Sequence, residues 1–329
     1  MYLLDHIVQC REPLLVRNHT GQTWRLPGAA DFAKRLTQCP LRYVLADDLV
    51  RICVELAYSE GDDLASCMDL VRFPAEQLWL EWNESVRVEE LSRVLRDCAV
   101  VPATSVRGGI LIAADSTGRS AVMRTFWLSR SDPREPLVGA GETIIDLDHA
   151  PPCADEVTKL LEGSAVRVRD TLNPNLDGLL HCAGFRLAPS WHRYYASVLR
   201  SDAMRDLVIA QTVGSVAFDV PWVLALLMLM RLRSGLAHRA ISSARINAKR
   251  ARLGRSALLD HIEVSCPLLS SVQPAASAEF DLQREGPRLH HVRGHLVRRD
   301  DVVFWRRPHW RGHLRLGCVR SRTVKLRAY

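Results

Sequence analysis

The chain has 329 residues, of which 47% are hydrophobic and 25% charged, which is the composition of a folded globular protein with room for more than one domain. Its nine cysteines are scattered and form no C-x-x-C pair, which argues against both a disulfide framework and a cysteine-rich zinc site. The first residues carry charges and no apolar run typical of a signal peptide, so we expect a protein of the reducing cytoplasm. We also expect no cofactor and no metal.

The net charge of +7 is distributed unevenly along the chain. Residues 231–329 hold 21 Lys and Arg against 7 Asp and Glu, whereas residues 1–230 hold 23 against 30. An excess of positive charge favours contact with phosphates, so the pattern predicts a C-terminal part that binds nucleic acid or another polyanion. The alternative is that arginine simply covers solvated surface, because almost all of the basic residues are arginine.

Residues 1–170 are expected to form a mixed α/β, acidic N-terminal domain. Helices are predicted at Gly28–Cys39 and at Asp47–Ser59, where acidic residues begin the second helix and apolar residues recur every three or four positions. A strand is predicted at Leu78–Trp82 because this segment is short and aromatic, and a further helix is predicted at Glu89–Cys98.

The clearest strand pattern of the N-terminal domain follows this helix. Gly109–Ala114 and Ser120–Leu128 flank a short turn that contains glycine, and this arrangement predicts a β-hairpin. Thr143–Leu147 is a further candidate strand, whereas Ser131–Gly141 has the composition of a loop.

Residues 171–235 are expected to form a helical core segment. Leu207–Met230 is strongly apolar, but Asp219 and Pro221 interrupt it, and a carboxylate is costly in lipid. We therefore expect two buried helices and no membrane span. Pro221 fits the first turn of a helix over Trp222–Leu232, and Asp219 is a candidate for its cap.

Residues 236–329 are expected to form a basic C-terminal α+β domain. The alanine content of residues 238–256 allows a helix, which Gly254 would end, and Ala257–Cys266 is a candidate strand.

Strands are also predicted nearer the C-terminus. Leu289–Arg299 and Val302–Arg306 are expected to pair around an Asp-Asp turn and, together with Asp260–Cys266, to form a small antiparallel sheet. The expected fold class is therefore α+β: a largely helical N-terminal body with a β-hairpin, and a small antiparallel sheet at the C-terminus.

Several motifs occur together in the C-terminal part. They are Asn247-x-x-Arg250, Arg252-x-Gly254, Leu258-x-x-His261, LHHVRGHLVR at 289–298, FWRRPHWRG at 304–312 and Ser321–Val324. This order resembles a family of uncharacterised phage and prophage proteins that end in a similar RGH…W…PHxRG element, and Trp79-Leu80-Glu81-Trp82 is similar to an N-terminal feature of such proteins. The resemblance covers about a quarter of the chain and implies a viral or mobile-element origin, but no particular activity.

The stretch Leu289–Arg315 concentrates histidine, arginine and aromatic residues more than any other. Arginine contacts phosphate through paired hydrogen bonds, and exposed aromatic rings stack on bases. We therefore interpret the C-terminal part as a nucleic-acid-binding region that is non-specific and sensitive to salt. The residues predicted to bind are Arg245, Lys249, Arg250, Arg252, Arg293, Arg298, Arg299, Trp305, Arg306, Arg307, Trp310 and Arg311.

A second interpretation of the same stretch is a metal-independent ribonuclease or nuclease of the toxin type. Histidine suits proton transfer near neutral pH, and arginine stabilises the charge that develops on a phosphate during cleavage. The residues that would carry this chemistry are His291, Arg293, His295, His309 and Arg311.

Other interpretations of the stretch are open. His309-x-x-x-His313 has the spacing of metal ligands on a helix, but Pro308 and Gly312 disfavour a helix there. Alternatively, the aromatic residues fill a small core while the charged residues meet solvent or the acidic N-terminal body. A virion or assembly protein that binds a protein partner is the third functional class.

Motifs of known chemistry are absent from the rest of the sequence. It has no phosphate-binding loop, no dinucleotide fingerprint, no H-E-x-x-H and no G-x-S-x-G. Asp146, Asp148 and His149 resemble a cluster of metal ligands, although a solvated strand end is the favoured interpretation.

Overall fold

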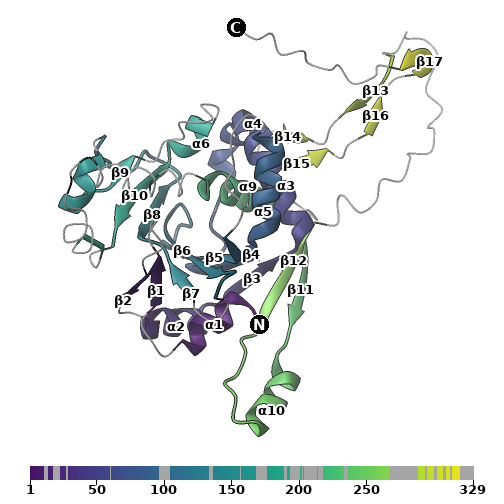
Figure 1. Cartoon of the computed structure of the whole chain (residues 1–329). Coiled ribbons are helices and arrows are strands. Elements are labelled where there is room, and N and C mark those ends of the chain that lie inside the picture. Colours follow the sequence, from purple (N-terminus) through teal and green to yellow (C-terminus); the bar gives the residue numbers. More distant parts are fainter. Residues whose placement is uncertain are drawn as a thin grey trace.

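The computed structural model describes residues 1–10, 14–17, 23–26, 29–59, 61–95, 104–132, 136–155, 157–167, 176–188, 191–192, 201, 203, 213, 218–232, 236–266, 288–292, 295–299, 302–306, 309–311 and 313–318. Within these ranges, a single sheet of 12 strands runs through the centre of the molecule (Figure 1). Its strands are β1 (Leu14–Arg17), β2 (Thr23–Leu26), β3 (Leu41–Leu45), β4 (Gln77–Asn83), β5 (Ser105–Ala114), β6 (Ser120–Ser129), β7 (Pro136–Val138), β8 (Gly141–Asp146), β9 (Val166–Arg167), β10 (Ala183–Leu187), β11 (Ala237–Ile241) and β12 (His261–Ser265).

The sheet is mixed and branches once. Its main path runs β11-β12-β3-β4-β5-β6-β7-β1-β2, and a branch of β8, β10 and β9 leaves from β6. Strands β12, β3 and β4 are parallel to one another, whereas β4, β5 and β6 are antiparallel. The parallel strands place their carboxyl ends at a common edge of the sheet.

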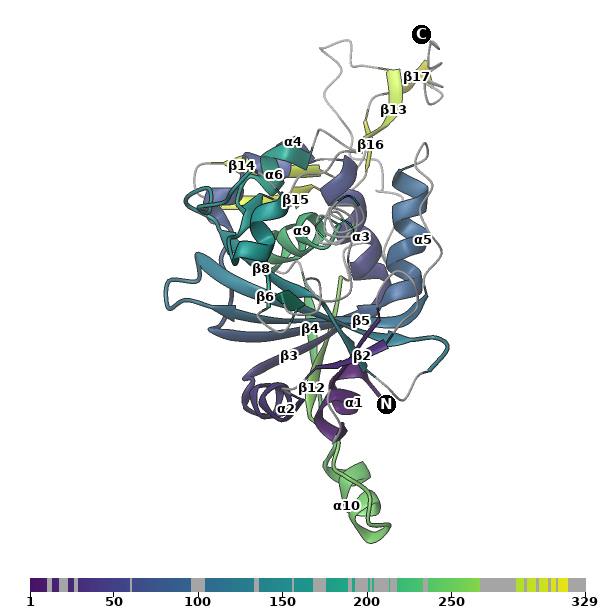
Figure 2. The same ribbon diagram turned by 60° about the vertical axis from the view of Figure 1, so that its left-hand side comes forward.

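Helices cover both faces of the sheet (Figure 2). One face carries α1 (Leu3–Gln9) and α2 (Ala29–Gln38). The other carries α3 (Asp47–Ser59), α5 (Glu84–Val94) and α9 (Val220–Arg231), with the shorter α4 (Gly61–Ala65) and α6 (Asp177–Leu180) near them. The 3-10 turn η1 (Met68–Leu70) contacts α9. A second 3-10 turn, η2 (Val157–Glu162), packs beside β9 and β10.

Strand β4 has large side chains on both of its faces. Trp79 contacts Phe126 on the side of α1 and α2, whereas Trp82 contacts Trp222 of α9, with ring centroids 4.8 Å apart. The neighbouring strand β5 makes room for both indoles with glycine: a Cβ on Gly108 would lie 2.4 Å from the ring of Trp82, and a Cβ on Gly109 the same distance from that of Trp79. These two glycines are therefore required by close packing.

Glu81 of β4 is fully buried and holds helix α1 on the sheet. Its carboxylate accepts hydrogen bonds from the backbone nitrogens of Leu3 and Leu4, at 2.8 and 3.1 Å, and pairs with Arg107 of β5. Unpaired N–H groups at a helix N-terminus favour a negative charge, so this buried carboxylate is stabilised where it lies.

A second group of buried charges lies beneath α9. Arg87 donates to Glu84 through two nitrogens, and its Nη1 lies 3.6 Å from Oδ1 of Asp219. Thr125 also donates to Asp219, at 3.2 Å. Burial, assisted by the negative charge of Glu84, raises the pKa of Asp219 to about 6 although Arg87 and Thr125 act in the opposite direction.

Several sequence predictions are confirmed by these elements. The helix predicted over Gly28–Cys39 is α2, that over Asp47–Ser59 is α3 with the same bounds, and the predicted hairpin is β5–β6. Helix α9 begins at Val220 with proline in its first turn, as expected, but the side chain of Asp219 makes no capping hydrogen bond. It turns instead toward Thr125 and Arg87 beneath the helix.

The predicted fold class is wrong. The body is organised around a large mixed sheet, and the strand at 261–265, which was expected in a small C-terminal sheet, pairs with β3 and β11 in this one. The physical reason is that β3, LRYVL, is a parallel strand buried in the sheet. Such strands lack the alternation of polar and apolar residues by which a strand is identified from sequence.

The C-terminal strands form two small separate sheets. They are β13 (Arg288–Val292), β14 (His295–Arg299), β15 (Val302–Arg306), β16 (His309–Arg311) and β17 (His313–Cys318). The predicted pairing around the Asp-Asp turn is confirmed as β14–β15, with Arg299 opposite Val302. However, Leu289–Arg299 is not one strand, because β13 pairs with β16 and β17.

The apolar segment near residue 220 does not form a membrane-length helix. Over the ranges given above, the structure contains no helix that is both long and apolar enough to span a bilayer.

Candidate nucleic-acid interface

A basic arm projects from the body and is built from β11, helix α10 (Ala244–Arg252) and β12. Figures 1 and 2 both show α10 standing away from the body, at the end of the two strands. Strands β11 and β12 are antiparallel, from Ala237 opposite Ser265 to Ile241 opposite His261, so the chain leaves the sheet and returns at the same place. Strand β11 is also the last strand of the sheet at this edge.

The tip of the arm carries positive charge only. Residues 242–258 contain Arg245, Lys249, Arg250, Arg252 and Arg255, and no acidic residue. None of the nine residues of α10, every one of which is described, is buried. The positive field of these five cations therefore extends into solvent, because no carboxylate of residues 242–258 neutralises it.

The exposed helix α10 depends on contacts with the rest of the arm, because an isolated helix of this length is unstable in water. Asn247 makes two of these contacts: its Nδ2 donates to the carbonyl of Leu258 at 2.9 Å, and its Oδ1 accepts from the backbone nitrogen of Leu258 at 2.8 Å. Nε of Arg250 donates to the carbonyl of Ser256 at 2.7 Å. Gly254 adopts φ +64, the left-handed conformation that turns the chain back after a helix.

The base of the arm is joined to the body by further hydrogen bonds. The nitrogen of Ser243 donates to Oδ1 of Asp260 at 2.6 Å, and its Oγ donates to the carbonyl of Leu259 at 3.1 Å. Leu259 in turn donates to Oδ1 of Asp5 at 2.9 Å, and Nε of Arg42 donates to the carbonyl of Asp260 at 2.7 Å. These bonds fix the direction in which the arm leaves the body.

The prediction of a helix over residues 238–256 is partly correct. Its first residues form strand β11, because pairing with β12 outweighs the helix preference of alanine. The helix occupies only Ala244–Arg252, and glycine at 254 lies just past its end as expected.

The predicted nucleic-acid-binding residues divide into two groups. Arg245, Lys249, Arg250 and Arg252 all lie on α10. The others are spread over the small sheets: Arg298 and Arg299 on β14, Trp305 and Arg306 on β15, and Trp310 and Arg311 on β16, with Arg293 and Arg307 outside the described residues. Arg306 and Arg311 are exposed.

The residues of the nuclease interpretation are not gathered on one strand. His291 lies on β13, opposite Trp310 of β16, and Val292 lies opposite His309. His295 lies on β14, in the other small sheet, opposite Arg306. The single strand predicted over Leu289–Arg299 would have put His291 and His295 on one face, but the chain changes sheet between them.

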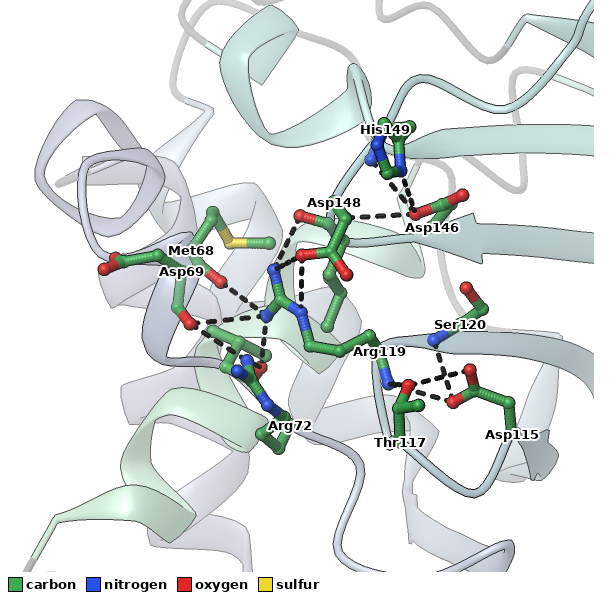
Figure 3. Close-up of polar contacts among 12 residues, drawn as sticks. Met68, Asp69, Arg72, Asp115, Thr117, Arg119, Ser120, Asp146, Asp148 and His149 are labelled. Carbon is green, nitrogen blue, oxygen red and sulfur yellow. Dashed lines mark hydrogen bonds and ion pairs between the residues drawn. The ribbon is translucent and has the colours of Figure 1, made fainter.

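Asp148, one of the candidate metal ligands at the end of β8, is engaged in a structural contact (Figure 3). Asp148 accepts from Nε of Arg119 at 2.8 Å, and this hydrogen bond lowers the pKa of the Asp148 carboxyl. The same guanidinium donates to the carbonyls of Val71 and Leu147, at 2.6 and 2.9 Å. His149 is 82% exposed, and the described part of the chain has no cluster of three or more residues suited to a metal ion.

An open groove of about 610 Å³ lies at the carboxyl ends of β12, β3 and β4, where open α/β sheets commonly bind ligands. Arg107, Arg239, Glu263 and Asp47 are among its lining residues. Arg107 pairs with Glu81, and Arg239 pairs with Glu263, so its cations are compensated. The groove therefore favours neither anionic nor cationic ligands, whereas the tip of the arm favours anionic ones.

No protein-family model, curated protein or solved structure matches this chain.

The interface also depends on residues that sequence reasoning did not identify. Arg42, Asp5 and Asp260 hold the arm, although the first two lie far from α10 in the sequence and the third falls within a predicted strand. Asn247 was marked only by the resemblance to phage proteins, and the structure shows its part in fastening the helix. No periodicity in the sequence reports such side-chain contacts with the backbone.

Proposed function

We propose that this protein binds nucleic acid and that the arm β11–α10–β12 makes a principal contact. The observation that carries the proposal is the group of five cations on residues 242–258, on a segment that projects into solvent and contains no acidic residue. Such a group attracts phosphates and releases the counterions condensed on them when it binds.

The contrast with other cations strengthens the proposal. On the body, Arg51 pairs with Glu89, Arg93 with Glu90, and Arg186 with Glu142. A paired charge has little effect beyond its partner once salt screens it. The cations at the tip of the arm have no carboxylate within their own segment, so their positive field extends into solvent where a polyanion can meet it.

The C-terminal strands support the same function. Arg306 and Arg311 are exposed on β15 and β16, and Arg298 and Arg299 lie on β14. They would provide additional phosphate contacts, since arginine binds phosphate oxygens through two nitrogens at once. A nuclease activity has less support, because His295 lies on a different sheet from His291 and His309.

The test is binding of the purified full-length protein to labelled single- and double-stranded DNA and RNA, measured by fluorescence anisotropy over a range of salt concentrations. We expect the affinity to fall steeply with salt. The triple variant Arg245→Ala/Lys249→Ala/Arg252→Ala should lower the slope of log affinity against log salt by about 2 to 3, because each phosphate contact contributes roughly 0.9 for duplex DNA.

The matched control is Lys34→Ala/Arg130→Ala/Arg231→Ala, which removes the same charge from exposed positions of the body. It should leave the slope nearly unchanged. An equal effect of both triple variants would exclude the arm as the site, and absence of binding to every probe would contradict the proposed function. Degraded probe in the presence of EDTA would favour the nuclease, and co-sedimentation with assembled particles without nucleic-acid binding would favour an assembly role.

A further inference from the structure

The side chains of α10 are arranged by chemistry around the helix. With 3.6 residues per turn, Asn247 and Arg250 share the side that is fastened to residues 256–258. Arg245, Lys249 and Arg252 follow the spacing i, i+4, i+7 and lie on the opposite side. The cations therefore form a stripe that points directly away from the returning chain.

An apolar flank adjoins this stripe. Ile246 and Leu253, which caps the C-terminus of the helix, are seven positions apart, lie on the same side, and are 55% and 60% exposed. Only one other large hydrophobic residue in the described ranges, Met1, is comparably exposed. The other flank consists of Ala244, Ala248 and Ala251, whose small side chains keep the helix narrow.

The dimensions of this helix suit one kind of nucleic acid. An α-helix with its side chains is about 10–12 Å wide. The major groove of B-form DNA is about 12 Å wide and exposes guanine acceptors, which arginine binds, and thymine methyl groups, which apolar side chains contact. The major groove of A-form RNA is deep and narrow, so side chains do not read it.

We infer that α10 enters the major groove of B-form duplex DNA, with the stripe Arg245–Lys249–Arg252 directed at phosphates and guanines and the flank Ile246–Leu253 directed at thymine methyl groups. This inference rests on the proposed function and names its substrate class. The fastened side of the helix, at Asn247 and Arg250, stays outside the groove and sets the depth of insertion.

The experiment compares three probes of the same mixed sequence with the full-length protein at moderate salt: a 20-base-pair DNA duplex, the same duplex with uracil in place of thymine, and the corresponding RNA duplex. We expect the RNA duplex to bind at least tenfold more weakly than the DNA duplex. The uracil duplex should bind about fourfold more weakly for each thymine methyl group that the helix no longer meets, since burial of one such group contributes about 0.8 kcal/mol.

The variant Ile246→Ser/Leu253→Ser should lose the preference for thymine over uracil while its salt dependence stays that of the natural protein. Both side chains are exposed, so the melting temperature should not change, which controls for folding. Equal binding of DNA and RNA duplexes, or indifference to the thymine methyl in the natural protein, would overturn the inference and leave the proposed function intact. Absence of binding to all three probes would contradict both.

Discussion

Asn247 and Leu258 are joined by two hydrogen bonds that run in opposite directions between one side-chain amide and one backbone residue. The contact links the middle of α10 to the chain that leads back to β12. It replaces the hydrophobic packing by which most short helices are stabilised, since no residue of the fully described α10 is buried. The arm is therefore held together by polar contacts with the backbone.

Substitution Asn247→Ala should loosen the arm without unfolding the body. Each of the two hydrogen bonds that it removes contributes about 1 kcal/mol, so hydrogen exchange at Leu258 and along α10 should become at least tenfold faster. The control is Ser256→Ala, because Arg250 bonds only the backbone carbonyl of that residue. The melting temperature of the protein should stay constant in both variants, and unchanged exchange in Asn247→Ala would show that the arm is held by other means.

Substitution Asp219→Asn should remove one component of the dependence of stability on pH. The folded pKa of Asp219, about 6, lies above its unfolded value near 3.9, so the folded state binds the extra proton between these values. Stability is then greatest below pH 4 for this group and falls as pH rises toward 6, by about 3 kcal/mol for a shift of about two units.

The measurement is urea denaturation of the natural protein and of Asp219→Asn at several pH values from 4 to 7.5. The free energy of unfolding of the natural protein, relative to the variant, should decrease across this range and become constant above about pH 7. A difference that does not vary with pH would show that Asp219 titrates normally in the folded protein.

Substitution Arg119→Ala should destabilise the body strongly. Arg119 is buried and donates to the carbonyls of Met68, Val71 and Leu147, so its removal leaves several acceptors unpaired, at a cost of about 3 kcal/mol or more (Figure 3). Thermal unfolding checks this, with Arg130→Ala as a control of equal charge at an exposed position. A melting temperature equal to that of the control would mean that water replaces the guanidinium.

The sequence allowed the amphipathic elements to be predicted. Helix α3 was located to the residue because acids begin it and apolar residues recur at helical spacing, and the β5–β6 hairpin followed from its glycine-containing turn. The central sheet was missed because pairing partners are distant: β12 at 261–265 lies beside β3 at 41–45. Local pattern carries no information about such partners.

The candidate site was predicted only in part. The cations of α10 were identified from their density in the sequence, but the histidine-rich stretch received more weight, and the structure divides it between two sheets. The bonds that build the arm, such as that from Arg42 to Asp260, join residues 218 positions apart. They depend on tertiary geometry, which composition does not report.

The base of the arm also has a consequence for the timing of folding. Asp5 receives its hydrogen bond from Leu259, 254 positions later, and β11 is attached to the sheet only through β12. During synthesis β12 leaves the ribosome after every other strand of this sheet, so the edge of the sheet at β3 can be completed only then. A polypeptide that stops before residue 261 would lack that strand and expose β3 as an unpaired edge. The positive tip would then have no fixed orientation, so the chain must extend through β12 to present it to a polyanion.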